Sequence, residues 1–316
     1  MQTIYSEILD KKPVFSGHET FPLRYGWLKK VYDSVSYSAK SGGSIKDLFN
    51  SDEAIASFGV GKNMVASMRH WATCSGILDS EGQSLTSYAK LILDDNGYDP
   101  WLESPISLWI LHWQLASKPK YLTYYWFFNF FNGTTFDREQ AYSSIISLCE
   151  DHQLKQPSSM TLKRDIDCFV RTYISKTNKT GKLSEDSLES PLAELGLITT
   201  VNRRDFFQPR RGSKSTLTRG VFLLVLYDFW SKNWQNQTSI SLEAITYDPN
   251  SPGRIFLLDE EAVLEIAYSL SSLNIGLEWS ETSGMRQFER SVSLDKIRDN
   301  AIALIKNEYA GKYEAK

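Results

Sequence analysis

Cysteine is scarce in this 316-residue sequence, which has only three: Cys74, Cys149 and Cys168. They are scattered through apolar helical contexts and form no CxxC pair, which argues against a zinc ribbon and a disulfide framework. No apolar run approaches the roughly 20 residues that a membrane span needs. The first residues also lack a basic region followed by an apolar stretch. The sequence therefore predicts a cytoplasmic protein that is neither exported nor inserted in a membrane.

An excess of one charge is also lacking, because 35 Lys and Arg face 38 Asp and Glu, for a formal net charge of −3. Any nucleic-acid site must then be a local basic patch rather than a field of the whole protein. Apolar residues are plentiful, at 41% of the chain with 13% aromatic, which is enough for buried cores in two or three domains.

Periodicity predicts a mainly α fold with small β-hairpins, in the α+β class, divided into three domains. Residues 1–95 form a winged helix-turn-helix, after a helix expected over 23–36. Residues 96–180 form an aromatic helical scaffold. Residues 181–316 form a winged-helix-like α+β domain that carries a basic tract.

The winged helix is predicted from residues 52–93. A short helix over 52–58 meets the turn Gly59-Val60-Gly61, a second helix runs over 62–75, and residues 76–86 return as a hairpin, the wing. The second helix has polar side chains away from its apolar stripe, and these are the expected DNA readers: Lys62, Asn63, Ser67, Arg69 and His70. The same pattern could instead serve contact with a protein, because many winged helices never bind DNA.

Aromatic residues crowd the middle of the chain between Trp109 and Phe131. Few basic residues lie among them, so we interpret them as core packing rather than as a platform for unpaired bases. A helix expected over 161–174 carries Lys163 and Arg164 on its polar side, and both are further candidates for DNA contact.

The most basic tract lies between residues 203 and 219, where six basic residues face the single acid Asp205. Guanidinium groups pair with phosphate oxygens, so the tract is suited to a nucleic-acid backbone, although a solvated hairpin would look the same. The DNA-binding candidates from this tract are Arg203, Arg204, Arg210, Arg211 and Lys214.

Catalytic candidates are His18 with Glu19, and Asp165 with Asp167. A nuclease needs carboxylates for a divalent metal, here Mg²⁺ or Mn²⁺, or a histidine base beside a cation. Two residues apart on a helix, the aspartates point about 200° apart and cannot both hold one metal without the help of another element. His18-Glu19 could equally be a turn motif before the next helix, so a structural role stays open for each pair.

Several long strings resemble a family of uncharacterised domains found beside DNA phosphorothioation enzymes, which includes SspB. They span most of the chain: Phe15–Lys30, Gly59–Val65, Leu111–Trp113, Thr161–Phe169, Glu185–Ser187 and Ser251–Arg254.

This resemblance implies a bacterial modification and defence locus, in which sulfur replaces a nonbridging phosphate oxygen and the SspB-like component nicks DNA. It further implies work beside a cysteine desulfurase, an ATP-using sulfur-transfer enzyme and an ATPase. The residues themselves support DNA binding, but they do not by themselves indicate that the protein nicks DNA. A noncatalytic DNA-binding adaptor, or a transcriptional regulator of the locus, is therefore the alternative, and a homodimer is possible in either case.

Overall fold

The computed structural model describes residues 12–50, 52–174, 190–201, 205–282 and 284–311. The chain is a mixed α+β protein dominated by helices, as the sequence predicts. It divides into two compact units, residues 1–127 with 132–208, and residues 128–131 with 209–316. The proposed domain boundaries near residues 95 and 180 stay a prediction. No helix in the described part is both long and apolar enough to cross a bilayer.

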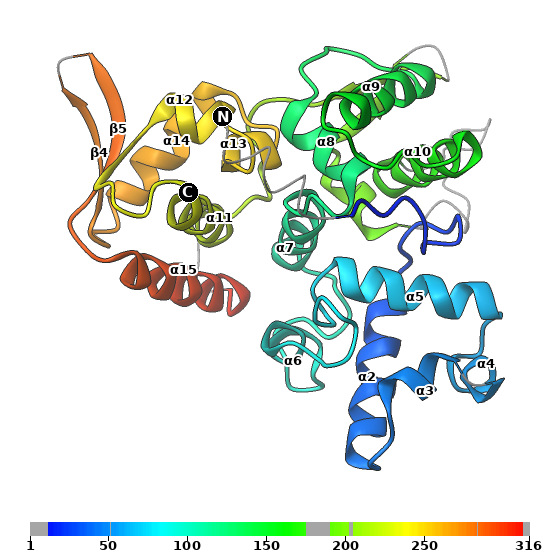
Figure 1. Cartoon of the computed structure of the whole chain (residues 1–316). Helices are drawn as coiled ribbons and strands as arrows, with labels where there is room; N and C mark the ends of the chain where they lie inside the picture. Colours follow the sequence, from blue (N-terminus) through cyan, green and yellow to red (C-terminus); the bar gives the residue numbers. More distant parts are fainter. Residues whose placement is uncertain (1–11, 51, 175–189, 202–204, 283, 312–316) are drawn as a thin grey trace. The chain divides into compact units, whose positions relative to one another are not determined.

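The first unit begins with helices that pack around α5, which crosses near one end of α2 in Figure 1 and also contacts α3 and α4. The bounds of its first helices are α2 Trp27–Lys40, α3 Ile45–Asn50, α4 Asp52–Phe58, α5 Lys62–Cys74 and α6 Ser87–Leu93. Helix α2 starts four residues later than expected, because Gly26 takes a left-handed φ of 75° and cannot continue the preceding turn as a helix.

A hairpin follows α5, as the turn residues predict. Leu78 and Leu85 form an antiparallel bridge, and the amide of Asp79 donates to the carbonyl of Ser84 at 3.0 Å. The carboxylate of Asp79 accepts from the amides of Glu81 and Gln83, which fixes the turn. The chain therefore runs helix, turn, helix and hairpin over residues 52–86.

The aromatic middle of the chain forms the helical core of the first unit, except for residues 128–131, which belong to the second. Its elements are α7 Pro105–Ala116, α8 Leu122–Phe130, α9 Arg138–Asp151, α10 Ser159–Tyr173, the 3₁₀ helix η2 Pro191–Leu195, and strands β1 Ile198–Thr200 and β2 Phe207–Pro209. Trp109, Tyr125 and Phe127 are 1% exposed or less, and the Phe127 ring lies 4.9 Å from that of Phe169. The prediction that these aromatics are core is confirmed, because burial leaves their faces no room to stack on bases.

The second unit combines helices with a small antiparallel sheet. Its elements are α11 Arg219–Asn233, β3 Ser239–Ser241, α12 Leu242–Tyr247, α13 Pro252–Ile255, α14 Glu260–Ser271, β4 Leu277–Thr282, β5 Met285–Arg290 and α15 Leu294–Tyr309. The three strands are antiparallel in the order β3-β5-β4, with Trp279 opposite Phe288. Helices α11 and α15 run side by side (Figure 1), and Gly220 allows this approach, since a Cβ there would lie 2.8 Å from the backbone nitrogen of Ile305.

Candidate functional site

The loop of residues 16–20, which we call the His18 loop, lies against α10. Three of its residues have left-handed backbone: Gly17 at φ 103°, Glu19 at φ 46° and Thr20 at φ 67°. Left-handed conformations are uncommon for residues other than glycine, so surrounding contacts must hold this loop. Arg171 of α10 supplies one, since its guanidinium donates to the carbonyl oxygen of Thr20.

His18 anchors the loop through both ring nitrogens. Its Nε2 lies 3.0 Å from Oδ1 of Asp165, 147 residues away, and its Nδ1 lies 3.0 Å from the backbone nitrogen of Thr20. A backbone N–H can only donate, so Nδ1 accepts, and the ring proton sits on Nε2 facing the carboxylate. The Thr123 hydroxyl donates to the other oxygen of Asp165. His18 and Asp165 are 3% exposed, so this cluster is buried.

This geometry restricts what His18 can do in catalysis. A general base needs one ring nitrogen directed at the reacting atom, whereas both nitrogens of His18 bond within the protein. In this arrangement the pair His18–Asp165 positions the loop. Glu19, the next residue, is exposed to solvent.

His70 of α5 lies under the same loop. Its ring is 5.8 Å from that of His18, and a Cβ at Gly17 would come within 2.7 Å of its Nδ1. Burial, together with the nearby His18 and Lys120, lowers the pKa of His70 to about 3. A neutral ring packed this way belongs to the support of the loop rather than to an open DNA-reading surface.

Asp167 faces a different way from Asp165, as their spacing predicted. Its side chain is 47% exposed, and it forms ion pairs with Arg138 at 3.2 Å and Arg171 at 3.3 Å. Arg138 also lies over the Phe207 ring, 5.0 Å from its centroid. Asp165 and Asp167 therefore do not share one site, although Arg171 connects Asp167 to the His18 loop.

The candidate residues of the His18 loop and α10 do not form a set of ligands for a divalent metal. Across the residues that the structure describes, no three His, Cys, Asp or Glu side chains are arranged to hold a metal ion. Asp165 is occupied by His18 and Thr123, and Asp167 by two arginines. Asp165 and Asp167 thus do not form a joint site for the Mg²⁺ or Mn²⁺ that the sequence suggested, while Glu19 is exposed to solvent.

The start of α5 presents polar groups to solvent. Lys62 and Asn63 are exposed, and Gly61 precedes them without a side-chain cap. Ser67, in contrast, is fully buried, because its position on α5 faces the core. Arg69 is half-buried over the Phe49 ring and lies near the hairpin carbonyl of Gly82. Of the five expected readers on this helix, two are fully solvent-facing.

The expected cations of α10 lie on its exposed side. Lys163 pairs with Glu139 at 3.0 Å and lies over the Tyr142 ring, while Arg164 is also exposed. Exposed pairs of this kind exchange readily with solvent and can be displaced by a phosphate.

The basic residues of the tract make different contacts from one another. Arg203 and Arg204 lie outside the described residues. The ammonium of Lys214 donates to three carbonyl oxygens, those of Arg210, Gly212 and Leu257, at 3.0, 2.6 and 3.0 Å. Burial lowers its pKa to about 8. All three of its N–H protons are donated within the protein, so Lys214 stabilises the loop of residues 210–214 rather than binding a phosphate.

Arg211 donates to the carbonyl of Phe131, near the end of α8, and Arg254 donates to the carbonyl of Asn129. Burial lowers the pKa of both guanidinium groups, that of Arg254 to about 10. Arg210 is exposed, with its side chain toward solvent.

Sequence reasoning missed Thr123, Arg138 and Arg171 as partners of the candidate carboxylates. The spacing of Asp167 and Arg171, four apart on one helix, carried a signal for their ion pair. Thr123 and Arg138 come from other helices, and no local pattern points to contacts over 42 or 29 residues.

This chain is similar to one protein family and to two solved structures. Residues 15–309 match DUF4007, described as a protein of unknown function. Two solved structures are similar, "Magnesium ion-bound SspB crystal structure" at 26% identity and "SspB crystal structure" at 27%. Each has a TM-score of 0.80 and covers 96% of this chain and 90% of the other. A search of curated proteins found no match. The matched residues span nearly the whole sequence, and the chain therefore belongs to the DUF4007 family.

Proposed function

We propose that this chain is the SspB-like, DNA-binding component of a DNA phosphorothioation system. The observation that carries the proposal is the likeness to SspB across 96% of the chain, at a TM-score of 0.80. It agrees with the phosphorothioation family that the sequence resembles. In this proposal the chain acts beside a cysteine desulfurase, an ATP-using sulfur-transfer enzyme and an ATPase, either as a single copy or as a homodimer.

The start of α5 supports the DNA contact. The amides of Met64 and Val65 donate to the carbonyl of Gly61, whereas no described residue accepts from the amides of Lys62 and Asn63. Free amides at the positive end of a helix dipole bind phosphate oxygens, and the Lys62 ammonium adds a full charge. In the proposed winged helix, α5 contacts DNA with this end and the hairpin of residues 76–86 is the wing.

Binding of a fluorescent 20-base-pair duplex, followed by anisotropy, tests the proposal. We expect Lys62→Gln to weaken binding and to reduce the salt dependence by about one phosphate contact. Lys306→Gln on the exposed side of α15 is the matched control and leaves binding unchanged. An affinity that Lys62→Gln does not alter would remove α5 from the interface, and no binding at low salt would refute DNA binding altogether.

Nicking is the finer form of this proposal. Glu19 is exposed on the strained His18 loop, and the half-exposed Asp167 is linked to the same loop by Arg171. Supercoiled plasmid incubated with Mg²⁺ or Mn²⁺ tests it. Relaxed plasmid that is lost with Glu19→Ala supports an endonuclease. A shifted but uncut plasmid supports the noncatalytic adaptor instead, and tight binding confined to one palindrome upstream of the locus supports a regulator.

A further inference from the structure

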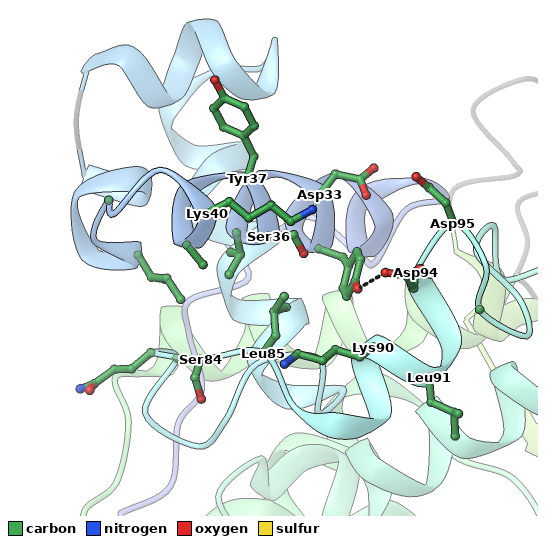
Figure 2. A pocket seen from close by; sticks show the side chains of 18 of the residues that line it. Asp33, Ser36, Tyr37, Lys40, Ser84, Leu85, Lys90, Leu91, Asp94 and Asp95 are labelled. Carbon is green, nitrogen blue, oxygen red and sulfur yellow. Dashed lines mark hydrogen bonds between the residues drawn. The ribbon is translucent and has the colours of Figure 1, made fainter.

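A long groove runs along the first unit between α2, the hairpin and α6. Its volume is about 1620 Å³, and its walls combine polar and apolar side chains. Helix α2 contributes one wall and α6 the other, with Ser84 and Leu85 of the hairpin between them (Figure 2). Arg69 of α5 also lines the groove, so the groove adjoins the second helix of the helix-turn-helix.

Two lysines reach into this groove from opposite walls. Lys40 lies along α2 and Lys90 rises from α6 (Figure 2), and both are exposed. Neither forms an ion pair at contact distance with a described residue, although the charge of Lys40 helps to lower the pKa of Asp94. Exposed cations without a fixed partner are the groups that exchange their counterions for phosphates.

The carboxylates of the groove, in contrast, are engaged. Asp33 and Asp95 both bind the ammonium of Lys29, at 2.8 and 2.7 Å, and Lys29 is itself buried. Asp94 accepts from the hydroxyl of Tyr32 and the amide of Asn96. Three cations, Lys40, Arg69 and Lys90, line the groove together with these three carboxylates, two of which are paired with the buried Lys29. The repulsion that these acids exert on an anion is therefore partly cancelled.

We propose that this groove holds a phosphodiester strand of DNA, with Lys40 and Lys90 contacting phosphates on either side. The inference rests on the proposed DNA binding and extends it, because the strand continues past the wing rather than ending at α5. A carboxylate of an acidic protein segment would also offer two oxygens to an ammonium group, so the choice of DNA rests on the phosphate contact proposed for α5, whose Arg69 lines the groove. Both duplex and single-stranded DNA carry the required phosphates.

The test is the salt dependence of DNA binding by the full chain, measured with a 20-base-pair duplex and with one of its strands. The double variant Lys40→Gln/Lys90→Gln is compared with Lys30→Gln/Lys306→Gln, which removes the same charge from exposed positions outside the groove. If both lysines contact phosphates, the slope of log K against log salt falls by about 1.8 for duplex or about 1.4 for a single strand. The control pair leaves the slope unchanged.

A smaller salt slope in the groove variant than in wild type supports the inference for either probe. The probe whose slope decreases shows whether the groove binds duplex or single-stranded DNA. If wild type binds DNA, loses affinity with Lys62→Gln, and keeps its slope in the groove variant on both probes, the groove inference is wrong while the proposed function stands. If wild type binds neither probe, the proposed function fails and the inference fails with it. Circular dichroism of all variants checks that the fold is kept.

Discussion

Replacing Asp165 tests how the His18 loop is held. In Asp165→Ala, the Nε2–H of His18 and the hydroxyl of Thr123 lose their acceptor inside a cluster that is almost fully buried. Each unsatisfied buried donor costs about 1–3 kcal/mol, so we expect the free energy of unfolding to fall by roughly 3–5 kcal/mol. Asp165→Asn keeps one acceptor but directs its amide at the other donor, and should cost about 1–3 kcal/mol.

The assay is urea unfolding followed by tryptophan fluorescence, and Asp167→Ala is the matched control. Asp167 lies two residues away on the same helix but is 47% exposed, so its ion pairs with Arg138 and Arg171 should contribute only about 0–1 kcal/mol. A double-mutant cycle with His18→Ala should show coupling of about 1–3 kcal/mol to Asp165. If Asp165→Ala costs no more than Asp167→Ala, the buried lock between His18 and Asp165 is refuted.

Three further predictions concern stability. Gly17→Ala should cost more than Gly26→Ala in urea unfolding, because both have left-handed φ but only at Gly17 would a Cβ come within 2.7 Å of His70; equal costs would contradict this. His70 has a pKa near 3 when folded, so the unfolded chain binds its proton first and stability should fall on the order of a few kcal/mol as pH drops from 6.5 towards 3. His70→Phe should flatten that part of the pH profile, and an unchanged profile would assign the loss to other groups. Lys214→Met should cost about 1–3 kcal/mol through its three carbonyl oxygens yet leave DNA affinity intact, whereas a selective loss of DNA binding would make Lys214 a phosphate contact.

Local patterns were enough to predict most elements of this fold. Helices α4 and α5 flank the expected glycine turn, and a hairpin follows α5 where the turn residues predict it. The burial of the aromatic middle also followed from composition, since few charges interrupt it. These features depend on residues close together in the chain, so the sequence carries their signal.

Contacts between distant elements were not predictable in the same way. His18 and Glu19 were separate candidates from Asp165, and nothing in their spacing shows that α10 brings Asp165 to His18. Similarly, charge alone made Lys214 resemble a DNA contact, but tertiary folding surrounds its ammonium with carbonyl oxygens. The pattern placed Ser67 on a polar face of α5, but this side chain is fully buried.

The most direct measurement for the central claim is anisotropy of a labelled duplex titrated with the purified chain over a range of salt concentrations. The account predicts binding that weakens steeply with salt and whose slope falls by about one phosphate contact in Lys62→Gln. It also predicts no change for Lys306→Gln. A chain that stays folded but leaves the anisotropy of the duplex unchanged at low salt would contradict the proposal that this protein binds DNA.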